Sequence, residues 1–175
     1  MSILSWLGIA DDEEAGTSVD SVGEIEKALS NLDPRQARYL ACFAYILSRV
    51  ARADHHVSDD ESRMMEQIVS ERGGIPAAQA ALAVRIATSE VHHHRGTQDF
   101  LVSREFDRLA SRDQKLALLD CLFAVSATDE SILTVEDNEV RRVASELRLE
   151  HGDYIAVRTA HVHNLEVLRQ RKPPS

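Results

Sequence analysis

A chain of 175 residues, of which 43% are hydrophobic and 28% charged, can bury one sizeable core and has the composition of an ordinary soluble globular domain. Its formal net charge of −9 excludes a general nucleic-acid-binding role, since such proteins present a basic face to the phosphate backbone. The two cysteines, Cys42 and Cys121, lie in apolar helical runs and form no CxxC pair. They therefore predict buried free thiols and no cysteine zinc site.

The first 22 residues predict a lead-in to the folded domain. MSILSWLGI is apolar, but it is too short for a membrane span and lacks the basic start of a signal peptide. It either packs on the domain, stays loosely ordered, or docks on a partner or a membrane surface. Residues 10–22 are acidic and small, which is typical of a flexible linker. We expect a cytoplasmic protein, with the periphery of the inner membrane as an alternative.

From residue 23 to residue 171 the patterns predict a single all-α domain of about seven to eight helices, followed by a tail over 172–175. No segment alternates with a period of two, so no strand is expected. The expected helices cover about 34–54, 60–72, 76–96, 98–110, 112–129, 135–148 and 153–171. Asp33 as N-cap before Pro34, and Ser111 with Gln114 as a capping box, mark two of the helix starts.

An internal repeat emerges when the chain is aligned with itself at an offset of 75 residues, which pairs 43–69 with 118–144 without gaps. The matched residues of the two connectors are Asp54 with Asp129, Val57 with Ile132, and Glu61 with Glu136. A shared helical period explains apolar matches, but it does not place carboxylates in register. The sequence therefore predicts an αα-hairpin used twice, over about 34–72 and 112–148, with the two pseudo-symmetric copies packed together.

The connectors VARADHHVSDDE and VSATDESILTVEDNE resemble the paired helix–turn–helix signatures of the TerB-like family. These bacterial proteins are named for tellurite resistance, and the fold also occurs at the N-terminus of DjlA-type co-chaperones. The resemblance spans roughly residues 24–170 and is closest to free-standing TerB-like proteins. It implies a compact all-α fold, a role in stress-response or membrane-associated complexes with an unidentified protein partner, and metal binding by acidic residues. Family members usually carry Gly after the motif Asp, where this chain has His55 and Glu130.

The candidate functional residues are the paired carboxylates Asp54 with Glu61 and Asp129 with Glu136. A carboxylate at a helix C-terminus meets the negative end of the dipole, at a cost of up to about 1 kcal/mol that something must offset. In a structural interpretation, the Asp accepts backbone N–H groups of the connector and the Glu begins the next helix. In a functional one, four carboxylates converge on Mg²⁺, Ca²⁺ or Mn²⁺. Acid/base catalysis is the third alternative, but no nucleophile or phosphate loop accompanies the pairs, so we expect a non-enzymatic protein.

The histidines are weaker candidates for metal binding. Consecutive residues on a helix fan out by about 100° each, so His92–His94 cannot converge on one ion from a single helix. They predict a polar helix end, with metal ligation as the alternative. His161 and His163 are expected to be isolated on different helix faces. Four large apolar residues are expected in the core: Met64, Met65, Phe100 and Phe106. Alternatively, Phe100, Phe106 and Leu109 lie near one helix face and line a shallow groove between the halves.

Overall fold

The structure is a computed structural model of the chain, and it describes residues 2–8, 19–51, 57–89, 96–127 and 134–171. Within these ranges the chain forms nine helices and no strand, which confirms the all-α prediction. The helices are α1 (Ile3–Trp6), α2 (Val19–Ser30), α3 (Pro34–Val50), α4 (Asp59–Gly73), α5 (Ala77–Ala87), α6 (Gly96–Leu109), α7 (Arg112–Ser126), α8 (Thr134–Glu146) and α9 (His151–Arg171).

The predicted helix starts are confirmed at both capped positions. The Asp33 carboxylate accepts the N–H groups of Arg35 and Gln36 at the start of α3. At the start of α7, Ser111 and Gln114 form the expected capping box. The helix expected over 76–96 is shorter, because α5 ends at Ala87. The histidine tract His92–His94 lies outside the described residues.

For the N-terminal segment MSILSWLGI, the sequence left open whether it packs on the domain, stays loosely ordered, or docks on a partner or a membrane surface. Leu4 and Leu7 are buried, with exposed fractions of 1% and 2%, so α1 packs on the domain. Helix α2 begins at Val19, and it contacts α3 and α5. Residues 9–18 lie outside the described residues, so the expectation of a linker there stays a prediction.

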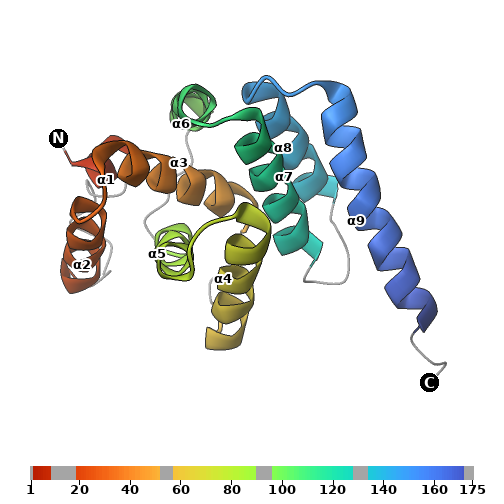
Figure 1. Cartoon of the computed structure of the whole chain (residues 1–175), viewed down its shortest axis with the longest axis horizontal. Helices are drawn as coiled ribbons and strands as arrows, with labels where there is room; N and C mark the ends of the chain where they lie inside the picture. The colour runs from red at the N-terminus through yellow and green to blue at the C-terminus, as the bar shows by residue number, and fades with distance from the viewer. Residues whose placement is uncertain (1, 9–18, 52–56, 90–95, 128–133, 172–175) are drawn as a thin grey trace.

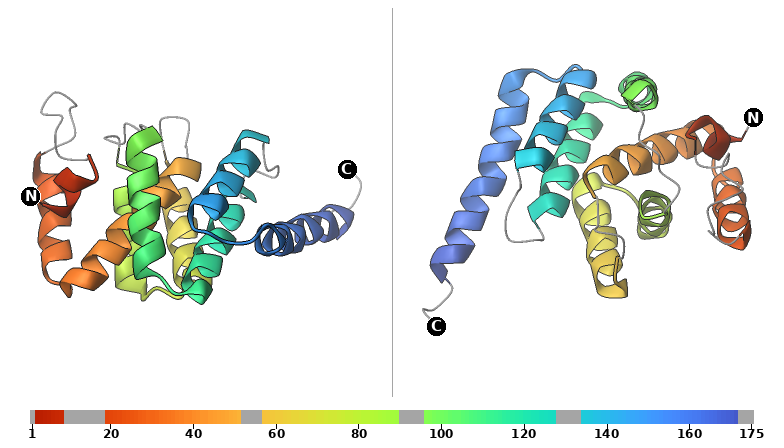
Figure 2. Two further views of the ribbon diagram at one scale, coloured as in Figure 1. Left: turned by 90° about the horizontal axis from the view of Figure 1, so that it is seen from above. Right: turned by 180° about the vertical axis from the view of Figure 1, so that it is seen from behind.

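Helix α3 lies at the centre of the molecule, with α5, α6, α7 and α8 packed around it (Figure 1). Helix α4 packs against α5 and α7. Helix α9 runs along the outside of α7 and α8 and extends beyond their ends (Figures 1 and 2). Because α3 is covered on all sides, every residue from Leu40 to Val50 is buried, including the polar Ser48 and Arg49.

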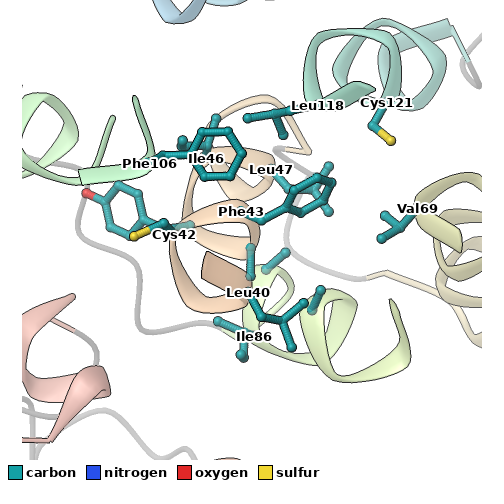
Figure 3. Packing of buried hydrophobic residues seen from close by; sticks show 14 of the residues in the cluster. Leu40, Cys42, Phe43, Ile46, Leu47, Val69, Ile86, Phe106, Leu118 and Cys121 are labelled. Atoms are coloured by element: carbon teal, nitrogen blue, oxygen red, sulfur yellow. The ribbon is translucent and has the colours of Figure 1, made fainter. Parts of the chain in front are cut away.

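The core is formed where α3 meets its neighbours. Phe43 and Leu47 of α3 face Leu118 and Cys121 of α7 (Figure 3), and all four are fully buried. Both cysteines are buried free thiols, as predicted. The end of α4 comes close to this core, since a Cβ on Gly73 would lie 3.3 Å from both the Cys121 Sγ and a Phe43 ring carbon. A side chain at position 73 would therefore require Cys121 and Phe43 to shift by a few tenths of an ångström in a closely packed core.

The two halves that the sequence repeat predicts differ in their packing. The matched apolar positions are buried in both halves: Phe43 and Leu118, Leu47 and Leu122, Met65 and Val140, and Val69 and Ala144. However, α8 packs against its chain neighbour α7, whereas α4 packs against α5 and α7 and has only weak contact with α3. The structure thus does not confirm a pair of equivalent αα-hairpins, and the pseudo-symmetry stays a prediction.

Candidate functional site

Among the four carboxylates predicted to bind a metal, the structure describes the side chain of Glu61 alone. Asp54 and Asp129 lie outside the described residues, and Glu136 is described only as part of the α8 backbone. The convergence of the four carboxylates is therefore untested and stays a prediction. In the described part of the chain, no three His, Cys, Asp or Glu side chains are grouped to hold a metal ion.

Glu61 fixes the start of α4. Its Oε2 accepts the backbone N–H of Ser58 at 2.7 Å and the Ser58 hydroxyl at 2.8 Å. In return, the Ser58 Oγ accepts the Glu61 N–H at 3.2 Å, which completes a capping box. This arrangement matches the structural interpretation of the connector for Glu61, since the carboxylate satisfies otherwise unpaired donors at the helix N-terminus.

A buried arginine joins the end of α3 to α8. Arg49 stands in the last turn of α3, five residues before Asp54, and its side chain is 1% exposed. Its guanidinium donates to Glu139 and Glu146 of α8, each at 2.7 Å, and to the Ser103 hydroxyl of α6 at 2.9 Å. The end of α3 is thereby tied to α8, the helix that follows the second connector.

The surroundings of Arg49 keep it charged. Burial disfavours the guanidinium, but hydrogen bonds and the negative charges of Glu146 and Glu139 outweigh that cost and raise the pKa of Arg49 above its ordinary value. The planar group uses several of its donors at once, which suits arginine better than lysine to this position. A buried ion network of this kind costs a large free energy if one member is removed.

One turn earlier on α3, a second buried polar contact joins α6. The Tyr45 hydroxyl donates to the Asp99 carboxylate at 2.8 Å. Burial, together with this hydrogen bond, raises the pKa of Tyr45 above its ordinary value. Glu139 also pairs with Arg142 at 3.6 Å, so the two carboxylates of α8 in this network are matched by two guanidinium groups.

A third polar cluster fixes the C-terminal helix and corrects the expectation for His161. His161 of α9 is buried, its Nε2 lies 2.6 Å from the Asp120 carboxylate of α7, and its ring stacks on Phe123. Arg72, at the end of α4, donates to the same carboxylate at 3.1 Å. Burial opposes ionisation of Asp120, but the hydrogen bonds from His161 and Arg72 outweigh it and lower the pKa of Asp120. His163 is exposed, as expected for a residue on a different helix face.

The sequence did contain a signal for His161. Tyr154, Val157 and His161 recur at a spacing of three and four, which places them on one face of a helix. Tyr154 and His161 are both buried on that face, against Phe123. No comparable signal marked Arg49 or Asp120, because their partners lie 41 to 97 residues away along the chain.

A cleft lies where the starts of α3, α5 and α7 meet the ends of α4 and α6. Its volume is about 670 Å³. The residues that line it are Asp33, Arg35, Gln36, Tyr39, Gly73, Gly74, Ile75, Pro76, Gln79, Leu109, Asp113, Gln114 and Ala117. Glu61, the described member of the predicted metal set, is not part of this lining.

The helices, packed around a central α3, place the chain in the class of all-α domains. Compared with models of protein families, the chain matches the one described as tellurite resistance protein TerB over residues 40–159. This segment is well over half of the chain, which therefore belongs to the TerB family. No curated protein and no solved structure matches the chain. The matched segment begins inside α3 and ends inside α9, so it contains both connectors but neither α1 nor α2.

Proposed function

We propose that this chain is a non-enzymatic TerB-type module that binds a divalent cation and acts in a stress-response or membrane-associated protein complex. The ligands would be Asp54, Glu61, Asp129 and Glu136, four hard oxygen donors suited to Mg²⁺, Ca²⁺ or Mn²⁺. A carboxylate has about four lone-pair sites, so Glu61 can ligate an ion while it caps α4.

The observation that carries this proposal is the buried bridge made by Arg49. It holds the end of α3, where the first connector begins, against α8, whose first turn contains Glu136. This bridge supports a shared ion site between the connectors over two separate structural turns.

The described clefts and thiols support a protein without catalytic activity. The residues that line the 670 Å³ cleft include no His, Cys, Ser or Lys, and of its two aspartates Asp33 caps the start of α3. The two thiols are buried, and burial raises the pKa of Cys42 and of Cys121 to about 12. Thiols of this kind remain protonated at neutral pH and are poor nucleophiles.

Isothermal titration calorimetry with Mg²⁺, Ca²⁺, Mn²⁺ and Zn²⁺ tests the metal site. We expect the full chain to bind at least one hard cation with a dissociation constant in the millimolar range or tighter, and Asp54→Asn/Asp129→Asn to weaken it about tenfold or more. Asp59→Asn/Asp60→Asn is the matched control, because it removes the same charge from two exposed residues in the first turn of α4. This control should leave the affinity within about twofold, since exposed charges act weakly through solvent.

Two results would contradict the metal site. One is the absence of binding at millimolar concentrations of all four metals. The other is equal affinity of the wild type and Asp54→Asn/Asp129→Asn, which would move the site elsewhere, with His92–His94 as the first residues to substitute.

The alternative function is a protein-interaction adaptor that needs no metal, similar to a co-chaperone domain. The observation that favours it is a set of large apolar side chains that the described surface leaves 40% to 51% exposed: Met64, Phe100, Leu101 and Ile155. The expectation that Met64 and Phe100 belong to the core is therefore wrong, whereas Met65 and Phe106 are buried as predicted.

No described helix is long and apolar enough to cross a membrane.

A further inference from the structure

A second cleft, of about 630 Å³, lies between α1 and the outer face of α6. Its lining residues are Trp6, Leu101, Arg104, Glu105, Asp107, Arg108 and Arg148. The cleft therefore combines two large apolar side chains with three arginines. We name it the α1–α6 cleft.

The Trp6 wall of this cleft is held in place by contacts on both sides. Gln98, near the start of α6, donates its side-chain amide to the Trp6 carbonyl at 2.7 Å. The Arg38 guanidinium of α3 lies 5.1 Å from the Trp6 ring, in a cation–π contact. Leu4 and Leu7 anchor α1 in the core on either side of Trp6. The indole is thus a fixed part of the cleft.

The cleft carries an excess of positive charge in a chain whose net charge is −9. Glu105 pairs with Arg38 and Arg108, and Asp107 pairs with Lys115 and Arg148. Each of these two carboxylates is thus already matched by two cations. Arg104 is a fifth cation and pairs with no carboxylate that the structure describes.

Arg148 contributes its charge from an unusual backbone conformation. It follows α8 with a φ of 57°, and its N–H donates to the Ser145 carbonyl at 3.0 Å. Glycine is the usual residue at such a left-handed helix end, because it has no Cβ to clash. Here an arginine occupies the position, with its Nε 3.4 Å from the Asp107 carboxylate.

Apolar groups are exposed next to these charges. Leu101 is 46% exposed in the lining, and Phe100 is 50% exposed. Phe100 and Arg104 are four residues apart, which separates them by about 40° around the helix, so they share one face. The opposite face of α6 is well packed, since Val102 and Phe106 are fully buried. Phe100 and Leu101 are therefore exposed even though α6 packs closely against the core on its other side.

We propose that the α1–α6 cleft is the docking site for an acidic segment of a partner protein, with carboxylates on both sides of a large apolar side chain. Arg104, Arg108 and Arg148 can hold the carboxylates with charge-assisted hydrogen bonds. Trp6 and Leu101 then cover the large apolar side chain of the partner. Trp and Arg are enriched at the centres of protein interfaces, and both residue types line this cleft. Docking in this cleft requires no metal ion, so it is independent of the cation site proposed above.

The charge distribution favours an acidic peptide over an anionic membrane or a nucleic acid. A bilayer or a duplex interacts with much of the protein surface, and the net charge of −9 repels it. A short peptide responds mainly to charges within a Debye length, about 8 Å at physiological ionic strength. Among the residues that line the cleft, three arginines outnumber two carboxylates.

One wall of the α1–α6 cleft lies outside the family match. Trp6 and the rest of α1 precede residue 40, where the similarity to TerB begins. The other lining residues, from Leu101 to Arg148, lie within the matched segment.

Selection of displayed random peptides on the full chain, followed by fluorescence polarisation of the enriched peptides, tests the proposal. We expect enrichment of peptides with Asp and Glu around Leu, Phe or Trp, with affinities that fall as salt rises. Arg104→Glu should weaken their binding about tenfold or more, and Leu101→Ser about fivefold. The matched controls are Arg63→Glu on α4 and Ile155→Ser on α9, which change exposed residues away from the cleft and should alter affinity by less than about twofold.

EDTA should leave peptide binding unchanged, which separates this result from the cation site. The proposal is overturned if no acidic peptide is enriched, or if Arg104→Glu binds the enriched peptides as well as Arg63→Glu does. It is also overturned if phosphatidylserine vesicles bind the chain in an Arg104-dependent manner while peptides do not. That outcome would assign the surface to a membrane.

Discussion

The two faces of α6 place similar polar groups in opposite settings. On the inner face, Asp99 and Ser103 are buried, and each receives a hydrogen bond from α3, from Tyr45 and Arg49 respectively. On the outer face, Arg104 is exposed and pairs with no described carboxylate, next to the exposed Leu101. One helix thus has an inner face whose buried polar groups are hydrogen-bonded and an outer face whose arginine pairs with no described carboxylate.

The difference separates what holds the fold from what is free to bind. A buried charge must be fully paired, so the inner face has one arrangement and little capacity to respond to a ligand. Exposed charges lose little when they are unpaired, because water solvates them. The outer face can therefore exchange water for a partner without disturbing the core.

The two faces of α6 should differ most in how much their aromatic residues contribute to the free energy of unfolding. Phe106 is fully buried among Tyr39 and Phe43, so Phe106→Ala should lower the free energy of unfolding by about 4 kcal/mol. Phe100→Ala should change it by less than about 0.5 kcal/mol. Urea unfolding followed by circular dichroism measures both values. A similar loss in the two variants would mean that Phe100 also packs in the core.

The next contrast is between two arginines. Arg49→Met leaves Glu139 and Glu146 without their buried partner, and we expect a loss of about 3 kcal/mol in unfolding free energy. Arg104→Met, the matched control on the outer face, should stay within about 0.5 kcal/mol of the wild type. Adding Glu139→Gln/Glu146→Gln to Arg49→Met should restore part of the loss. Failure of this rescue would show that the arginine stem, and not its charge, stabilises the α3–α8 contact.

The smallest effect concerns the pH dependence of an outer-face ion pair. The hydrogen bonds from Arg108 hold the pKa of Glu105 below its ordinary value, and they outweigh the opposing effect of burial. The unfolded state then binds the proton first as the pH falls, so Glu105 stabilises the fold above its ordinary pKa of about 4.3 and loses this effect below it. Compared with Glu105→Gln, the wild type should be more stable by less than about 1 kcal/mol at pH 7.

Urea titrations of the wild type and Glu105→Gln between pH 7 and pH 3 measure this difference. It should shrink as the pH falls below about 4. A difference that grows in acid would contradict the lowered pKa of Glu105.

Local features of the fold were predictable from the sequence. Asp33 with Pro34 and the Ser111–Gln114 box each act through neighbours within a few residues, and each marks a helix boundary in the structure. Helical periodicity, with no alternating segment, likewise predicted the all-α class. These signals work because caps and helical faces are determined by adjacent residues.

The polar clusters were not predictable, for a physical reason. Arg49 at the end of α3 has the sequence context of an ordinary solvent-exposed cation that complements the helix dipole. Its burial follows from the approach of α8, whose Glu139 and Glu146 lie 90 and 97 residues further along the chain. The same applies to Phe100, which the amino-acid type alone assigned to the core. Its exposure depends on which side of α6 faces α3.

The left-handed Arg148 implies a conflict between stability and recognition. A glycine at this helix end would relieve backbone strain of roughly 1 kcal/mol. It would also remove one of the three guanidinium groups around the α1–α6 cleft. With arginine at position 148, this turn is thus less stable than it would be with glycine. In exchange, the chain keeps a positive charge in the lining of the cleft. Sequences selected for stability alone should lose Arg148 early, whereas sequences selected for partner binding should retain it.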